Sequence, residues 1–323
     1  MNQEFELIAK TFQGLEETLA QELTELGASN IEIGRRMVSF TGDKAMMYKA
    51  NFCLRTAIRI LKPIKHFTAQ TADDVYDAIK NIHWEDYLDN MSSFAVEAVV
   101  FSSEFRHSKF VAYKVKDAIV DYFREKTGNR PSVRINNPDL LINIHVAENN
   151  CTLSLDSSGE SLHRRGYRQE AVEAPLNEVL AAGMILMTGW RGECDLIDPM
   201  CGSGTIPIEA ALIAKNRAPG LYRSFVAQQY CWSDNATWER VRLQAKEREY
   251  HGQYKILASD NDPKCVSLAM ANAKKAGVAD CITFKDGDAT KMDLPAQEGI
   301  IVCNPPYGQR MMEQQSAQRL YAA

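Results

Sequence analysis

Between Cys194 and Cys303, short apolar strands alternate with helices, and this alternation constrains the fold more than any other feature of the chain. The pattern predicts strands at 194–198, 255–260, 281–285 and 299–303, and helices at 205–215 and 263–276. Apolar strands that are separated by helices are typical of a parallel sheet with helices on both faces. The second half of the chain is therefore predicted to be α/β.

The first predicted strand ends in Asp198 and is followed by Gly202 and Gly204, which open a helix. Glycines let the backbone approach a ligand closely, and a helix N-terminus offers free N–H donors. A tight strand-to-helix turn explains Gly-x-Gly equally well. An acid at the end of the strand suits a ligand ammonium, such as an amino-acid group, better than a pyrophosphate.

Two more acids follow the next strands of the pattern. Asp260 is expected to accept hydrogen bonds from ribose hydroxyls, whereas Asp262, which precedes Pro263, is predicted to cap the next helix. The spacing from the glycines exceeds the usual ~20 residues, so we expect a helical insert at 216–252. Asp288 follows the third strand and suits an adenine amino group, with a simple Asp-Gly turn as the alternative.

The last predicted strand ends in Asn304-Pro305-Pro306-Tyr307. Proline fixes φ and has no N–H, so the Pro305 carbonyl is available to a ligand. The Asn304 side chain adds a second acceptor, and Tyr307 offers a flat face on which a base can stack. A strand-ending turn is the alternative. Together with the three strand-end acids, this motif predicts S-adenosylmethionine and a base that carries an amino group.

The first half of the chain contains strands with interspersed helices and no Gly-rich phosphate loop, which is typical of a small α+β module. Strands are predicted at 4–9, 30–41, 56–66, 94–101, 132–136, 140–147 and 151–156, and helices at 14–26, 43–51, 71–80 and 109–126. A polar linker at 158–175 leads to a helix at 176–188.

The net charge of −5 does not favour a nucleic-acid partner, but the charge is unevenly distributed. Six Lys or Arg residues and no acid lie between Lys44 and Ala72. Local positive potential can attract a polyanion even to an acidic protein. Solvated helix faces are the alternative explanation of each basic cluster.

The sequence also excludes several classes of protein. It has no run of 18 apolar residues, so no membrane span is expected. The N-terminus is acidic and lacks an apolar signal core, so we do not expect a secreted protein. None of the eight cysteines forms a C-x-x-C pair, which argues against zinc, iron–sulfur and disulfide frameworks. We therefore expect a cytoplasmic protein without a metal.

Four motifs together resemble the bacterial THUMP-domain RNA guanine-N2 methyltransferases of the N-P-P-Y group: LHRRGYR (162–168), APLNEVLAAGMI (174–185), DPMCGSGTIPIEAA (198–211) and NPPYGQR (304–310). The resemblance covers essentially the whole chain. It is greatest to the branch that acts on 23S rRNA, whose members are often described as N6-adenine-specific DNA methylases. It implies a ferredoxin-like part at 1–43, a THUMP RNA-binding domain at 44–157 and a Rossmann-like S-adenosylmethionine-dependent methyltransferase domain at 158–323.

The resemblance also implies roles for single residues. Asp198, Gly202 and Gly204 are expected to bind the methionine end of the cofactor, Asp260 the ribose and Asp288 the adenine. The expected cofactor contacts also include Cys201, Thr205 and Asn304. The expected catalytic residues, which hold the target base, are Asn304, Pro305, Pro306 and Tyr307. Structured RNA is the expected partner, contacted by Arg55, Arg59, Lys62, Lys65, Lys109, Arg164, Arg165 and Arg168.

Other substrates remain open at this point. Guanine in tRNA and adenine N6 in DNA or RNA also offer an exocyclic amine, and a non-catalytic RNA-binding or assembly protein could keep the cofactor fold. Methyltransferase sheets of this family continue after the N-P-P-Y strand, whereas residues 309–323 are expected to form the next helix. We therefore expect the methyltransferase domain to be truncated, with an exposed sheet edge and little activity.

Overall fold

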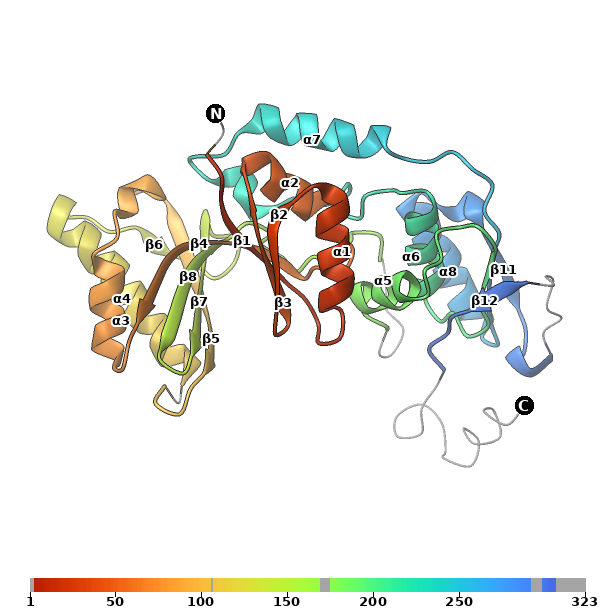
Figure 1. Ribbon diagram of the computed structural model, residues 1–323, viewed down its shortest axis with the longest axis horizontal. Helices are drawn as coiled ribbons and strands as arrows, with labels where there is room; N and C mark the ends of the chain where they lie inside the picture. The colour runs from red at the N-terminus through yellow and green to blue at the C-terminus, as the bar shows by residue number, and fades with distance from the viewer. Residues whose placement is uncertain (1–2, 106, 169–174, 292–297, 306–323) are drawn as a thin grey trace. The chain divides into compact units, whose positions relative to one another are not determined.

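The computed structural model describes residues 3–105, 107–168, 175–291 and 298–305 (Figure 1). The chain forms two compact units: unit 1 comprises Met1–Leu162 and Ser224–Leu243, and unit 2 comprises His163–Arg223 and Gln244–Ala323. Within the described ranges, no helix is both long enough and apolar enough to cross a membrane.

Unit 1 is built on an eight-stranded sheet in the order β2-β3-β1-β4-β8-β7-β5-β6. Its strands are β1 (Phe5–Lys10), β2 (Ser29–Gly34), β3 (Met37–Gly42), β4 (Arg59–Thr68), β5 (Ser93–Phe101), β6 (Ser132–Val133), β7 (Leu140–Ala147) and β8 (Asn150–Asp156). Its helices include α1 (Glu16–Leu26), α2 (Lys44–Cys53), α3 (Ala72–Lys80) and α4 (Ser108–Thr127). The strand pairs are antiparallel except for β5, which runs parallel to both β6 and β7.

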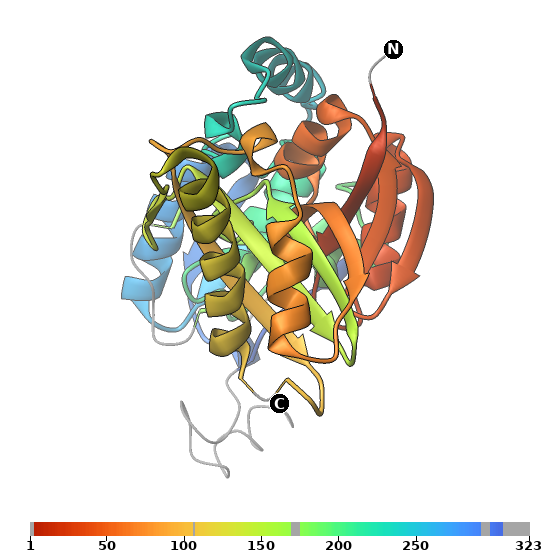
Figure 2. The same cartoon turned by 90° about the vertical axis from the view of Figure 1, so that its left-hand side faces the viewer.

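Helices α3 and α4 lie side by side on one face of this sheet (Figure 2). Helix α3 begins with a capping box, in which Thr71 and Asp74 accept hydrogen bonds from each other's backbone N–H groups. Its buried side chains, Val75 and Ile79, are four residues apart and so share one face. Helix α4 ends at Gly128, which has a φ of +73° that favours glycine.

The insert between the two halves of unit 2 forms a short 3₁₀ turn (Val226–Gln229) and helix α7 (Asn235–Glu247). Trp238 of α7 stacks on Tyr48 of α2, with ring centroids 3.9 Å apart, and on Phe225 at 5.4 Å. Phe52 meets both Phe225 and Trp238 edge-on. We call Tyr48, Phe52, Phe225 and Trp238 the aromatic cluster. Through it, the segment Ser224–Leu243 packs in unit 1, although it lies within the predicted methyltransferase range 158–323.

Unit 2 contains a four-stranded parallel sheet in the order β11-β10-β9-β12. Its strands are β9 (Asp195–Asp198), β10 (Ile256–Asp260), β11 (Ile282–Asp286) and β12 (Gly299–Ile301), and its helices include α5 (Glu178–Met187), α6 (Thr205–Ala214) and α8 (Pro263–Ala276). The predicted parallel α/β half and the α+β first half are both confirmed.

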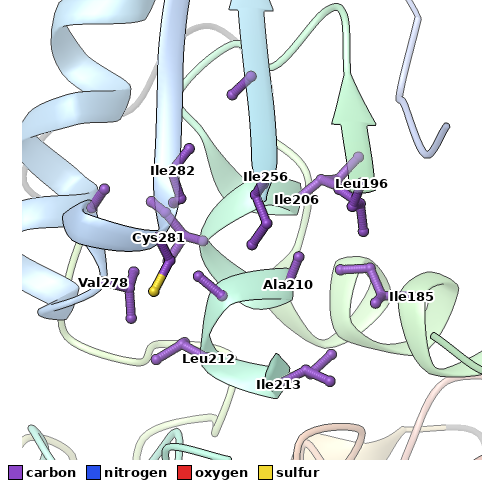
Figure 3. Packing of buried hydrophobic residues seen from close by; sticks show 14 of the residues in the cluster. Ile185, Leu196, Ile206, Ala210, Leu212, Ile213, Ile256, Val278, Cys281 and Ile282 are labelled. Carbon is purple, nitrogen blue, oxygen red and sulfur yellow. The ribbon is translucent and has the colours of Figure 1, made fainter. Parts of the chain in front are cut away.

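The core of unit 2 forms where the sheet meets α6 (Figure 3). Leu196, Ile256 and Ile282 extend from three neighbouring strands and pack with Ile206 and Ala210 of α6. Every residue of α6 is buried, which explains why its sequence, TIPIEAALIA, is apolar around the whole helix except at Thr205 and Glu209.

The register of this sheet places Asp198, Asp260 and Asn304 at one edge. Ala258 of β10 pairs with Asp198 of β9, and Ile301 of β12 pairs with Ile197. Strands β10 and β12 thus flank β9 on opposite sides, which makes the end of β9 a switch point in the strand order. Ligands of open α/β sheets bind at such switch points, outside the carboxyl ends of the strands.

Replacement of Trp238 by alanine tests the packing of the insert in unit 1. The buried indole makes two stacked ring contacts and one edge-on contact, and large-to-alanine changes in a core cost about 3–5 kcal/mol. We expect Trp238→Ala to lower the free energy of unfolding by about 3 kcal/mol, measured by urea denaturation. Leu243→Ala on the same helix is the matched control, since Leu243 is 58% exposed. Equal effects of the two changes would contradict this packing.

Candidate active site

Asp198, the last residue of β9, is only 1% exposed. Its Oδ1 accepts a hydrogen bond from Met200 N–H at 3.2 Å, whereas its Oδ2 has no hydrogen-bond partner among the described residues. Burial, with a smaller contribution from the charge of Asp260, raises the pKa of this carboxyl to about 7. A cationic group that binds at Oδ2 would offset the cost of ionising Asp198.

The loop that follows, Cys201–Thr205, is held by backbone geometry that only glycine adopts easily. Gly202 has a φ of +52° and Gly204 a φ of +84°. Cys201 N–H donates to the Ser259 carbonyl at 2.8 Å, so the loop stays against β10. A Cβ on Gly204 would lie 2.8 Å from the Cβ of Ala269 in α8. Gly204 therefore permits close packing of the loop on α8.

Asp260, the last residue of β10, lies beside this loop. Its Oδ2 accepts from Gly202 N–H at 2.8 Å, and its Oδ1 accepts from Asp262 N–H at 3.0 Å. A carboxylate oxygen has two lone pairs, so each one can accept a further hydrogen bond from a hydroxyl. Asp262 caps α8 through Lys264 N–H, with Pro263 at the first helical position, which confirms the predicted cap.

Asp288 lies two residues beyond the end of β11. Its Oδ1 accepts from the N–H and the hydroxyl of Thr290, at 3.0 and 2.8 Å, and its Oδ2 lies 3.6 Å from Lys291 Nζ. The carboxylate is exposed and anchors a local turn. This agrees with the alternative explanation of this stretch, which is a simple turn. The adenine contact remains a prediction for Asp288.

Asn304 and Pro305 follow β12 and lie next to β9. Val302 N–H donates to the Ile197 carbonyl at 3.0 Å, so the chain reaches Asn304 alongside the start of the Cys201–Thr205 loop. Burial and the charge of Asp198 raise the pKa of the Cys303 thiol, which indicates that these two side chains are near one another. Asn304 is exposed, as a residue that meets a substrate must be. The predicted residues Pro306 and Tyr307 lie outside the described residues.

Two of the arginines predicted to contact RNA are used inside unit 2 instead. Arg165 is 3% exposed, and its Nε lies 3.5 Å from Glu209 Oε1, which also accepts from Tyr167. Arg168 donates to Glu178, Ser203 and Thr205. The fold buries the guanidinium of Arg165 against the carboxylate of α6, and protein groups take up the guanidinium of Arg168, so the RNA contacts stay predictions for both arginines.

The basic residues of unit 1 that are predicted to contact RNA also differ in exposure and in their contacts with protein groups. Arg55 is 7% exposed, and its RNA contact also stays a prediction. Arg59 forms ion pairs with Asp156 and Glu97, Lys62 lies between the rings of Phe5 and Trp232, and Lys65 donates to the Ala78 carbonyl. The side chains of Lys109 and Arg164 are exposed, so these two remain candidates for RNA contact.

Two buried residues that support the Cys201–Thr205 loop and Arg168 were not among the predicted site residues. Asn272 of α8 is fully buried, and its Nδ2 donates to the Ser203 carbonyl at 3.0 Å. Glu178 in the first turn of α5 is buried and accepts from Arg168. A polar residue on the apolar face of a helix could have identified Asn272, since Val266, Ala269 and Ala273 are its buried neighbours on α8.

The described residues contain no group of three or more His, Cys, Asp or Glu side chains that could hold a metal ion.

Three protein families match successive parts of the chain. Residues 6–61 match the RlmL ferredoxin-like domain, residues 69–156 match the THUMP domain, and residues 165–323 match the RMKL-like methyltransferase domain. The ferredoxin-like match reaches residue 61, beyond the predicted boundary at 43.

Relatives match along nearly the whole chain. A Synechocystis protein, provisionally named an RNA methyltransferase, is 38% identical over 315 residues, which cover 97% of this chain and 82% of that protein. The crystal structure of a provisionally named N6-adenine-specific DNA methylase from Listeria monocytogenes superposes with a TM-score of 0.91 at 33% identity, over 99% of this chain and 84% of that one. A provisionally named methyltransferase, SMU.472, complexed with S-adenosylhomocysteine (SAH), superposes with a TM-score of 0.90 at 32% identity, over 99% and 85% of the two chains.

The raised pKa of Asp198 gives a stability prediction. The folded protein holds this proton up to about pH 7, whereas the unfolded chain releases it near pH 4. Because the native state binds more protons between these values, the free energy of unfolding falls as the pH rises through this window, by at most about 1.4 kcal/mol per pH unit from this group. We expect Asp198→Asn to remove this contribution, measured by hydrogen exchange of β9 and β10 in denaturant. Asp195→Asn, at the other end of β9, is the control. An unchanged pH slope in Asp198→Asn would refute the prediction.

The two loop glycines give a matched pair of variants. Both have positive φ, but only at Gly204 would an added Cβ meet another atom within 4 Å. We therefore expect Gly204→Ala to weaken cofactor binding by at least tenfold more than Gly202→Ala, a difference of about 1.4 kcal/mol or more. Calorimetric titration with SAH measures both. A loop that tolerates the two changes equally would show that the contact with Ala269 is unimportant.

Proposed function

Because the chain belongs to the THUMP-domain methyltransferases with an RMKL-like catalytic domain, we propose that it methylates the exocyclic N2 amine of a guanine in 23S rRNA. At the coarser level, it is an S-adenosylmethionine-dependent RNA methyltransferase with a THUMP domain. The observation that carries the methyltransferase part of the proposal is the buried Oδ2 of Asp198, which has no partner among the described residues and lies beside the glycine loop, at the same sheet edge as Asn304.

The residues at this edge fit S-adenosylmethionine. Asp198 Oδ2 would accept from the ammonium of the methionine end, and the Cys201–Thr205 loop, with the first N–H groups of α6, would face its carboxylate. Asp260 has the lone pairs to accept from ribose hydroxyls while it holds Gly202. The SMU.472 relative forms a complex with SAH, which supports S-adenosylmethionine as the cofactor. When bound, the cofactor supplies an electrophilic methyl group.

The chain's own contribution to the reaction is to hold the amine. An exocyclic amine is a poor nucleophile because its lone pair is delocalised into the ring. The Asn304 side-chain carbonyl and the Pro305 carbonyl accept its two N–H bonds, which returns electron density to the nitrogen and fixes its direction. Positioning and fixed dipoles of this kind supply most of the catalysis. The methylated nitrogen then loses its proton to water.

The target base must leave its stack to reach Asn304, so the substrate is an unpaired or extruded nucleotide. Unit 1 contains the THUMP match and is the proposed contact for structured RNA, with Lys109 as an exposed cation on the first turn of α4. Adenine N6 is the second candidate, because it offers the same pair of N–H donors and the Listeria relative is named for that reaction.

Asn304→Ala tests the role of the amine acceptor. Loss of one preorganised hydrogen-bonding group in an active site lowers kcat by roughly 100-fold or more. We expect that loss in single-turnover methyl transfer at saturating S-adenosylmethionine, with the dissociation constant of RNA changed by less than twofold. Asn235→Ala, which removes an amide from the start of α7, is the control. Unchanged methyl transfer by Asn304→Ala would exclude the proposed mechanism.

The substrate is tested in cells. Mass-spectrometric mapping of rRNA and tRNA from a deletion strain should show the loss of one N2-methylguanosine in 23S rRNA. Loss of N6-methyladenosine instead would favour the second candidate. If all methylated nucleosides persist, the binding role without catalysis becomes the better explanation.

A further inference from the structure

The guanidinium of Arg168 connects the linker before α5 to the cofactor loop. Its Nη1 lies 3.0 Å from Ser203 Oγ, and its Nη2 lies 3.1 Å from Thr205 Oγ1. Nη2 also donates to the Leu176 carbonyl at 3.2 Å. One side chain therefore contacts residues on both sides of Gly204.

Glu178 fixes the plane of this guanidinium. Its Oε1 accepts from Nε at 3.0 Å and from Nη2 at 2.8 Å. The side chain of Glu178 is 5% exposed, and that of Arg168 is 20% exposed. A planar guanidinium that is paired in this way presents its remaining N–H groups in fixed directions. Ser203 and Thr205 are thus held by a rigid donor.

The loop needs such support because it contains two glycines. Glycine loses more conformational freedom on folding than any other residue, so a Gly-x-Gly loop is costly to order. Asn272 holds the Ser203 carbonyl from α8, while Arg168 holds the Ser203 hydroxyl. Ser203 is therefore fixed from two sides, between Gly202, whose N–H donates to Asp260, and Gly204, which packs on Ala269.

The direction of these hydrogen bonds has a chemical consequence. Arginine only donates, so the hydroxyl oxygens of Ser203 and Thr205 act as acceptors in these contacts. Each hydroxyl keeps its own proton for donation to another group. Contact with Arg168 thereby biases both residues toward donating, the character that suits an anionic ligand at the start of α6.

We propose that Arg168 is a positioning residue for the cofactor loop, which it preorganises through the hydroxyls of Ser203 and Thr205. The proposal rests on the proposed function, because it assigns the ligand of this loop to S-adenosylmethionine. A loop that is already ordered in the free protein loses little conformational entropy when the ligand binds. It therefore binds the ligand more tightly than a disordered loop would. The role differs from an RNA contact, since the guanidinium faces protein groups.

Arg168→Lys is the test variant. Lysine keeps a positive charge near Glu178, but a single ammonium cannot reproduce the fork that reaches the carboxylate and two hydroxyls together. We expect the dissociation constant of SAH to rise about tenfold, measured by calorimetric titration, with the melting temperature and the RNA affinity nearly unchanged. Arg191→Lys is the matched control, because Arg191 donates to the carbonyls of Leu186 and Trp190 and has no described contact with the loop.

Ser203→Ala completes a double-mutant cycle and protects the test against misfolding of Arg168→Lys. It removes one hydroxyl but keeps the pair of Arg168 and Glu178. We expect the single variant Ser203→Ala to weaken SAH binding. We expect the double variant to bind SAH more tightly than the sum of two independent losses of binding free energy would allow.

Several results would overturn the inference. An unchanged SAH affinity of Arg168→Lys would contradict it. So would additive losses of SAH affinity in the double-mutant cycle, or an Arg168→Lys protein that loses only RNA affinity. A fall in melting temperature with unchanged SAH affinity would assign Arg168 a purely structural role. A wild-type protein that binds no SAH would instead contradict the proposed function, and the inference with it.

Discussion

The burial of a carboxylate at the end of β9 is the constraint on which the rest of the site depends. A parallel sheet brings the ends of its strands to one edge, and the change of strand order at β9 opens that edge to a ligand. Asp198 lies there with one oxygen satisfied by the backbone and the other without a described partner. Such a group is costly to ionise in the free protein, and a ligand cation removes that cost.

The loop next to Asp198 is determined by contacts from three directions. Asp260 accepts from the Gly202 amide, Asn272 donates to the Ser203 carbonyl, and Arg168 holds the Ser203 and Thr205 hydroxyls. Each of these side chains comes from a different part of unit 2. The same packing that buries α6 and α8 therefore also shapes the loop, and stability and cofactor binding share their determinants in this unit.

Much of this arrangement could be predicted from the sequence. Most of the predicted strands and helices that lie in the described residues form within three residues of their expected ends, because apolar periodicity and end residues such as Asp262 and Gly128 determine them locally. The stretch 30–41 forms two strands, and the insert expected at 216–252 is helical only at Val226–Gln229 and Asn235–Glu247. The helix expected at 309–323 lies outside the described residues. Two acids and Asn304 meet at one edge because parallel strands leave no other arrangement. The burial of Arg55 and Arg165 could not be predicted from runs of basic residues, since burial depends on partners that are distant in sequence. Glu209, a lone acid in an apolar helix, was the available sign of a buried partner. The packing of Trp238 on Tyr48 likewise depends on a contact across 190 residues.

Proton release on ligand binding tests the central claim most directly. With a pKa of about 7, about half of the Asp198 carboxyls carry a proton at pH 7, and an ammonium at Oδ2 requires the ionised form. Calorimetric titration with SAH in two buffers of different ionisation enthalpy should therefore show release of about half a proton per ligand, and this release should be absent in Asp198→Asn. Identical proton release by the two proteins, or none from the wild type, would contradict the account.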